Sequence, residues 1–313
     1  MIFMQHNRRS LVPGILSLLF FAFAALSTIC VGAEFDWRTY AGNSTLPAGN
    51  YVTAVRDQGH AGTCWAFGVV AAVESRYAIN NKIINPTIDL SEQNLVCAGV
   101  QNGFGDITGG YASSAIGYVY TTGIVTEAQM PYTALNTSPN WPLTQPYTLY
   151  KITNYNYISH TTAASIKTAL TSYGPLVIAI YANTDWYWPT DTSSSSTTIS
   201  TTEMSGLSED DPTGSINHTV LITGYTDDSS IAGAGGGYFH IKNSWGASWG
   251  PNGLGSGDGY GYVTYATMLQ SDHYVYAISG SVYTVYVPEP STLAGFFSMT
   301  VIGLLIVICR RRK

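Results

Sequence analysis

The sequence has 313 residues, of which 45% are hydrophobic and only 10% are charged, and its formal net charge is −6. This length suffices for one large domain or for two lobes that share a core. Lys and Arg together number only 13, and several of them stand at the two ends of the chain, so the composition argues against nucleic acid as a partner.

Residues 1–33 have the pattern of a secretory signal peptide. Arg8 and Arg9 precede an apolar run from Ile15 to Ile29, and Val31-Gly32-Ala33 supplies the small residues of a cleavage site. We expect cleavage after Ala33, and the alternative is an N-terminal membrane anchor. In either case we expect the following residues to be carried across the inner membrane.

Helices are expected in the first half of the exported part, at about residues 50–150. The stretch from Cys64 to Asn80 is apolar on most faces and too long for a strand, so it predicts a buried helix that begins near Thr63. Ser91, with an acidic residue after it, predicts the N-cap of a second helix. A third, weaker helical pattern covers Ala112 to Thr121.

Strands are expected in the second half, at about residues 151–280. Four apolar segments separated by turn residues have strand character: Leu176–Ile180, Thr219–Thr223, Tyr238–Lys242 and Tyr260–Thr264. A Ser/Thr-rich stretch at 190–202 and a glycine run at 233–237 are interpreted as loops between strands. Helices followed by strands indicate the α+β class.

Residues 281–313 predict a membrane-associated tail. Leu293 to Cys309 is uncharged and apolar, at the short end of what spans a bilayer, and the basic residues after it place that end in the cytoplasm. With Pro288-Glu289-Pro290 in front, this segment resembles a PEP-CTERM sorting tail, and the resemblance implies an exosortase-type sorting machinery as a partner. The alternative is a permanent single-pass anchor through the span 293–309. We therefore expect the protein at a bacterial cell envelope, or outside the cell once the tail has been processed.

Cys64 is the candidate nucleophile. Two of the four cysteines lie in the predicted signal peptide and span, which leaves Cys64 and Cys97 in the exported part. A thiol at a helix N-terminus lies in the positive end of the helix dipole, which favours the thiolate. The alternative is a small buried hydrophobic residue, which is the common role of a lone cysteine.

Three further residues have the chemistry that such a nucleophile needs. His218 begins an apolar strand and can act as a base. The Asn243 carboxamide can accept from one ring N–H of a histidine and leave the other ring nitrogen facing the thiol. The amide of Gln58 can donate to a developing oxyanion, and Trp245 can cover the His–Asn bond. Ordinary turn and core positions remain the alternatives for each.

Several short motifs around these residues occur in one characteristic order. They are Gln58 with Cys64-Trp65-Ala66-Phe67, Leu90-Ser91-Glu92-Gln93, Gly109-Gly110-Tyr111, Asn217-His218 and Lys242-Asn243-Ser244-Trp245-Gly246. Across about residues 35–264 they resemble the successive signatures of the papain family of cysteine peptidases. Each motif alone is weak, but the ordered set is specific.

The resemblance implies a papain-like two-lobe fold, with a helical N-terminal lobe, an antiparallel β-barrel-like C-terminal lobe and the active site in the cleft between them. It implies that Cys64 is the nucleophile, His218 the acid and base, Asn243 the residue that orients His218, and Gln58 an oxyanion donor. The domain would cover residues 34–280.

The resemblance also implies that Gly109, Gly110 and Trp245 contact an extended protein or peptide substrate. No cofactor or metal is expected. We therefore predict an exported cysteine endopeptidase that forms an acyl-enzyme. The alternatives are an inactive surface or matrix module with the same fold, and an acyl transferase that passes the thioester to an amine.

The sequence departs from the family pattern in four ways. Ala61 and Ile107 stand where the family has a disulfide, so both halves of that bridge are missing together. Cys97 has no identifiable partner, and we expect a free buried thiol. His60 is expected to be a solvent-facing loop residue. Only Glu34 and Phe35 separate the predicted cleavage site from a mature-like start, which predicts a chain without a long inhibitory prosegment.

Overall fold

The computed structural model describes residues 32–135, 143, 145–182, 216–231, 233–250, 258–269 and 273–289. The predicted signal peptide up to residue 31, the Ser/Thr-rich stretch and the predicted span 293–309 lie outside the described residues. Among the residues that the structure does describe, no helix combines the length and the apolar character that a bilayer crossing requires.

Three helices form the first part of the fold, as predicted. They are α1 (Cys64–Asn81), α2 (Glu92–Asn102) and α3 (Ala112–Thr121). Ser91 caps α2, because its side-chain oxygen accepts from the backbone N–H of Asn94 at 3.0 Å. Between α2 and α3, the short strands β2 (Gly105–Asp106) and β3 (Gly109–Gly110) pair with each other.

The second part is built on a seven-stranded sheet in which every pairing is antiparallel. Its order is β5-β10-β6-β7-β8-β9, and β1 adds to β7. The strands are β1 (Glu34–Asp36), β5 (Asn156–Ile158), β6 (Leu176–Ile180), β7 (His218–Asp227), β8 (Gly237–Lys242), β9 (Tyr260–Thr264) and β10 (Tyr274–Ala277). Two further helices accompany the sheet, α4 (Ala163–Tyr173) and α6 (Tyr265–Met268).

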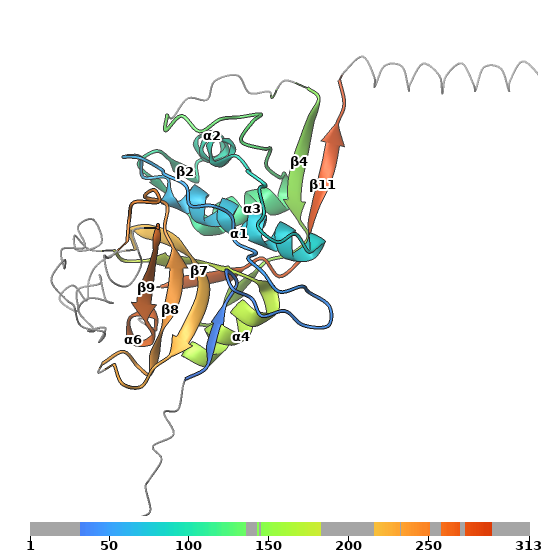
Figure 1. The fold of residues 1–313 in the computed structure, drawn as a ribbon. Coiled ribbons are helices and arrows are strands. Elements are labelled where there is room, and N and C mark those ends of the chain that lie inside the picture. Colours follow the sequence, from blue (N-terminus) through green and yellow to red (C-terminus); the bar gives the residue numbers. More distant parts are fainter. Residues whose placement is uncertain are drawn as a thin grey trace, which may run out of the picture. The chain divides into compact units, whose positions relative to one another are not determined.

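A separate two-stranded ribbon lies beside the helices. It pairs β4 (Tyr147–Ile152) with β11 (Val282–Val287), and Figure 1 shows it next to α1 and α3. The sequence analysis placed residues 281–287 in the C-terminal tail, whereas the structure places Val282 in the core. The residues of β11 favour a strand, but only the pairing with β4, which is remote in the sequence, shows that this segment belongs to the fold.

Helix α1 is the element that joins the two parts. It is buried between α2 and α3 on one side and β6 and β7 on the other, which accounts for its apolar residues on most faces. A Cβ atom at Gly68 would lie 2.7 Å from Cγ2 of Thr219, closer than real Cβ contacts. Glycine at this position therefore lets α1 approach the start of β7.

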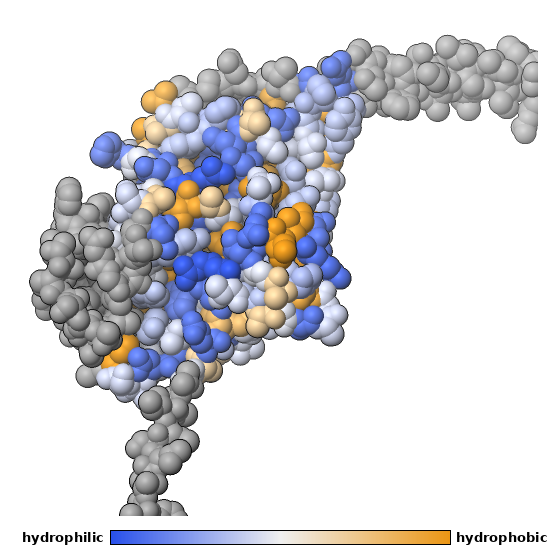
Figure 2. All heavy atoms as spheres, in the orientation of Figure 1, coloured by the Kyte–Doolittle hydropathy of each residue, from blue (hydrophilic) through white to orange (hydrophobic). Residues whose placement is uncertain are grey.

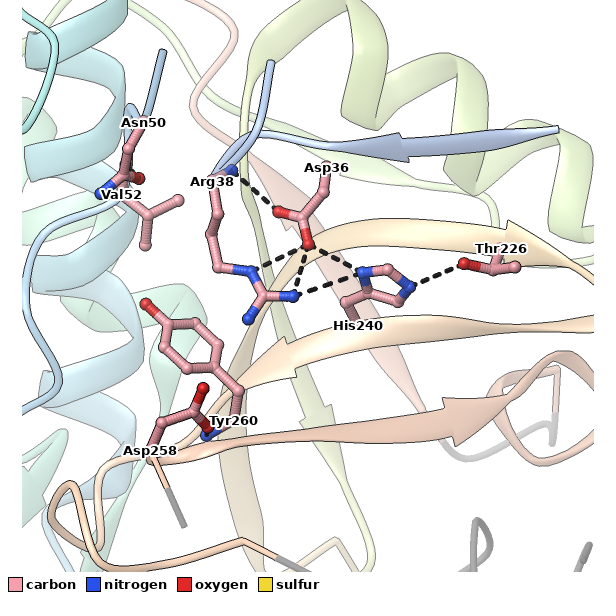
Figure 3. Close-up of polar contacts among 8 residues, drawn as sticks. All are labelled: Asp36, Arg38, Asn50, Val52, Thr226, His240, Asp258 and Tyr260. Atoms are coloured by element: carbon pink, nitrogen blue, oxygen red, sulfur yellow. Dashed lines mark hydrogen bonds and ion pairs between the residues drawn. The ribbon is translucent and has the colours of Figure 1, made fainter. Parts of the chain in front are cut away.

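The N-terminal strand is fastened to the sheet by a buried polar cluster, drawn in Figure 3. Asp36 Oδ2 accepts from Nη2 and Nε of Arg38 at 2.6 and 2.8 Å and bonds Nδ1 of His240 at 2.7 Å. Nε2 of His240 bonds the Thr226 hydroxyl at 2.9 Å, and the Arg38 guanidinium lies 4.2 Å from the ring centroid of Tyr260. The cluster thus ties β1 to β7, β8 and β9.

Apolar groups form small, separate areas among hydrophilic ones on the face drawn in Figure 2. The large apolar side chains that remain exposed are spread over several elements, and the most exposed is Tyr111. Most of the large apolar side chains instead join one core cluster that draws on both the helices and the sheet.

Candidate active site

Cys64 is the first residue of α1 and is 7% exposed. Thr63 precedes it as the N-cap but makes no side-chain cap, because its hydroxyl bonds that of Tyr132 at 2.7 Å. The amide groups at the start of α1 are therefore left without a side-chain cap. These amides and the helix dipole favour negative charge at the Cys64 sulfur.

His218 is the first residue of β7, and Asn243 follows the last residue of β8. Nε2 of His218 lies 2.9 Å from Oδ1 of Asn243. The same Oδ1 atom accepts from the backbone N–H of Ser244 at 2.8 Å, which identifies it as the oxygen end of the amide. Nε2 must then donate to it, so in the neutral ring Nδ1 carries the lone pair.

Trp245 covers this pair. Its ring centroid lies 4.5 Å from that of His218 with the planes tilted by 31°, and Trp249 packs edge-on against it at 5.7 Å. The covered bond lies between two side chains that are 4% and 2% exposed, so water is kept from it.

Gln58 lies on a loop that is bonded to both sides of the site. Its backbone N–H donates to the Ser244 carbonyl at 2.8 Å, and its side-chain oxygen accepts from the Ser244 hydroxyl at 2.6 Å. Its Nε2 donates one proton to the Ala61 carbonyl at 2.7 Å. The hydroxyl of Tyr132 bonds both the Gln58 carbonyl and Thr63, so the loop is held against the start of α1.

Cys64 and His218 line the same cavity, which has a volume of about 570 Å³. Gly109 and Gly110 line it as well, and a Cβ atom at Gly110 would lie 2.5 Å from the Trp65 ring. Glycine is thus required at Gly110 so that the strand can lie flat on Trp65. The described residues that line this cavity include neither Gln58 nor Trp245, which were predicted to act there.

The comparison with known families agrees with this arrangement. Residues 31–257 match the family model described as papain family cysteine protease. The chain belongs to the papain family of cysteine proteases.

Curated relatives of this papain-family chain include cathepsins from several kingdoms. Pro-cathepsin H of Medicago truncatula is 32% identical over 230 residues, which are 73% of this chain and 57% of the relative. The gamete and mating-type specific protein A of Dictyostelium discoideum is 35% identical over 205 residues, which are 65% of this chain and 40% of the relative. The chain thus spans about half the length of these relatives.

Solved structures show the predicted fold. The bromelain protease from Ananas comosus, in complex with the E64 inhibitor, has a TM-score of 0.55 at 24% identity, covering 82% of this chain and 99% of the bromelain chain. Digestive procathepsin L 3 of Tenebrio molitor larval midgut has a TM-score of 0.53 at 25% identity, covering 80% and 71%. The two-lobe papain-like α+β fold is therefore confirmed.

Burial favours the neutral forms of both the Cys64 thiol and the His218 ring, and it shifts their pKa values in opposite directions. Burial raises the pKa of the Cys64 thiol, although hydrogen bonds from Thr219 and Trp65 oppose the shift. Burial lowers the pKa of His218 to about 4, and the bond to Asn243 opposes it. Each charge alone is disfavoured, but a proton transfer from sulfur to Nδ1 forms both charges together, and their attraction offsets part of the cost.

The departures from the family pattern have structural counterparts. Among the described residues, Cys64 and Cys97 are both buried and neither forms a disulfide, which agrees with the buried thiol predicted at Cys97, and His60 is exposed. Where the family disulfide is missing, the N–H of Gly62 donates to the Ile107 carbonyl at 2.6 Å. A Cβ atom at Gly62 would lie 2.7 Å from the Thr108 carbonyl oxygen, so the two loops still pack closely without a covalent link.

Sequence reasoning missed the roles of Thr219, Ser244 and Tyr132. Thr219 opposes the rise that burial causes in the pKa of Cys64, Ser244 fixes Gln58 and Asn243, and Tyr132 links the Gln58 loop to Thr63. Thr219 and Ser244 directly follow predicted site residues, which is a weak signal, and Tyr132 has none. In the described part of the chain, no group of His, Cys, Asp and Glu side chains is arranged to hold a metal ion.

Proposed function

We propose that the protein is an exported cysteine endopeptidase that hydrolyses peptide bonds of proteins or peptides at Cys64. The observation that carries the proposal is that Cys64, at the start of α1, and His218, paired with Asn243, line one cavity. A histidine that is held at Nε2 by Asn243 and lines the same cavity as a thiol at a helix N-terminus is an arrangement for nucleophilic catalysis.

The first half of the reaction forms an acyl-enzyme. Nδ1 of His218 takes the Cys64 proton, and the sulfur attacks the peptide carbonyl carbon. The carbonyl oxygen gains the negative charge, which the Cys64 backbone N–H and the second N–H of the Gln58 amide stabilise. His218 then gives its proton to the amine nitrogen, and the C–N bond breaks.

The second half returns the enzyme to its starting state. Water loses a proton to Nδ1 of His218 and attacks the thioester carbonyl. The C–S bond breaks, and the sulfur recovers its proton from His218. Throughout, Oδ1 of Asn243 holds Nε2–H, so that the ring keeps one orientation while it exchanges the proton at Nδ1.

The deciding experiment is labelling of the purified protein with a thiol-directed epoxide, read by mass spectrometry, beside cleavage of a denatured protein. Modification of Cys64 with loss of cleavage is expected, and Cys64→Ala should neither react nor cleave. An unreactive Cys64 in the folded protein would favour the inactive module. Adding an amine tests the remaining alternative, since amide products exceeding hydrolysis would identify a transferase.

We also propose that residues 1–33 direct export and that residues 288–313 form a sorting tail with a span at 293–309. Support comes from the sequence pattern, since these segments lie largely outside the described residues. N-terminal sequencing of the protein from the cell envelope should find Glu34 first. An intact N-terminus in the cytoplasmic fraction would exclude export.

A further inference from the structure

A small second cavity is lined in part by Asn243. It has a volume of about 20 Å³. Its polar lining combines Asn243 and Arg56 with the buried groups Glu74, Glu92 and Lys242, and apolar atoms of Phe67, Ala71 and Val220 complete it. It therefore lies where the helices meet the sheet, between α1, α2, β7 and the end of β8.

Two residues that line this cavity each have a buried donor without a hydrogen-bond partner among the described residues. The donors are Nδ2 of Asn243 and Nε of Arg56. Asn243 is 2% exposed, and its Oδ1 is committed to His218 and Ser244, so Nδ2 lies at the other end of the amide. Buried donors in native proteins almost always have a protein or water partner.

Acceptors line the same cavity. Glu92 is 4% exposed and Glu74 is 2% exposed. The Glu74 oxygens accept from the Leu90 N–H at 2.8 Å and the Thr53 hydroxyl at 2.5 Å, and each carboxylate oxygen has a second lone pair. Burial raises the pKa of Glu92 and lowers that of Lys242 to about 8, as expected for charges removed from solvent.

The size of the cavity matches one water molecule. A water needs roughly 10–15 Å³ of such space and two to four polar partners, and it can accept two hydrogen bonds and donate two. We propose that one buried water occupies this cavity, accepts from Nδ2 of Asn243 and Nε of Arg56, donates to Glu92, and makes Glu92 a positioning residue for Asn243.

The consequence for the reaction rests on the proposed function. With Nδ2 held by the water, both ends of the Asn243 amide are bonded, so its plane is fixed relative to Nε2 of His218. Without the water, Nδ2 is a buried unpaired donor, and the amide gains by rotating toward another acceptor. Rotation would misalign His218 and slow proton transfer while leaving substrate binding unchanged.

The first test is a high-resolution crystal structure of the purified protein. A single density peak is expected within about 3 Å of both Nδ2 of Asn243 and Nε of Arg56. An empty cavity would overturn the proposal. The density can be observed whether or not the protein cleaves peptides. This experiment therefore tests the presence of the water independently of the proposed peptidase activity.

The second test compares Glu92→Leu with Glu92→Gln, which keeps an acceptor of the same shape. We expect Glu92→Leu to lower kcat by about tenfold at unchanged KM through the lost buried hydrogen bond, and Glu92→Gln to retain most of the activity. Gln101→Leu, on the exposed side of α2, is the matched control.

Equal kinetics of Glu92→Leu and Gln101→Leu would overturn the positioning role, even with the water present. A rise in KM together with the fall in kcat would do the same, because it indicates a general disturbance of the site that also weakens substrate binding. If Glu92→Leu does not fold, the proposal is still tested by the activity of Glu92→Gln and by the density in the unmodified protein.

Discussion

Nε2 of His218 donates to Oδ1 of Asn243 across 2.9 Å, with the ring of Trp245 packed 4.5 Å from the imidazole. With Nε2 committed to Asn243, the proposed mechanism requires Nδ1 to accept the thiol proton. The bond also opposes the effect of burial, which lowers the pKa of His218 to about 4.

The pH profile of cleavage should therefore have its acid limb near pH 4. The base must be neutral, so kcat/KM should fall as the pH falls through the pKa of His218. Asn243→Ala removes the hydrogen bond that raises this pKa, so its acid limb should move to lower pH. Its kcat should fall by roughly tenfold to hundredfold, since general acid–base catalysis supplies 10²–10⁴. An acid limb that moves upward would contradict this account.

Gly68→Ala should separate α1 from β7. The new Cβ atom would lie 2.7 Å from Cγ2 of Thr219, and such overpacking costs about 1–3 kcal/mol. Urea unfolding should show the loss of stability, and epoxide labelling of Cys64 should slow. Thr219→Ser lacks Cγ2, so the double variant should recover most of both properties. If the double variant is no better than Gly68→Ala, the contact is not the cause.

The cavity beside Cys64 should select uncharged substrate side chains. No Asp, Glu, Lys or Arg is among the described residues that line it, and its lining includes Ala179, Ile216 and Tyr276. A peptide library should therefore show preference for apolar or aromatic side chains close to the cleaved bond.

Ile216→Glu compared with Ile216→Gln tests this selection, because the two variants differ in charge but hardly in shape. We expect Glu at this position to raise kcat/KM for lysine-containing peptides at least about tenfold over the Gln variant, through a partly desolvated charge pair. Equal preferences in both variants would show that this cavity does not hold the selecting side chain.

Asp36 should stabilise the protein at neutral pH more than in acid. Burial would raise its pKa, but hydrogen bonds from His240 and Arg38 and the Arg38 charge lower it to about 2. The folded pKa is below the unfolded value, so the stabilisation is present above about pH 4 and is lost as the pH falls through 2. Asp36→Asn should cost about 2 kcal/mol at pH 7 and clearly less near pH 2, measured by urea unfolding. An equal cost at both pH values would contradict an ionic role.

Local residue patterns, each within a single segment, were sufficient to predict many of the helices and strands. The apolar run from Cys64, the Ser91 cap and the strands at Leu176–Ile180 and Tyr260–Thr264 were predicted within a residue of their observed bounds. Each depends on its own neighbours, through helical hydrogen bonds, a cap or strand alternation. Helix α4 and strand β11 were not predicted. The Val, Thr and Tyr residues of β11 favour a strand by themselves, but its pairing with the remote strand β4 is a tertiary contact that no local pattern encodes.

The sequence by itself determined which residue types were present for the chemistry and, through their order, the family they resemble. Only the tertiary structure decided which atoms meet. It brought His218, on β7, and Asn243, directly after β8, into one bond, and it joined β1 to β8 through Asp36 and His240. These contacts join residues far apart in the chain, and their geometry follows from how α1 packs on the sheet, which no local pattern encodes.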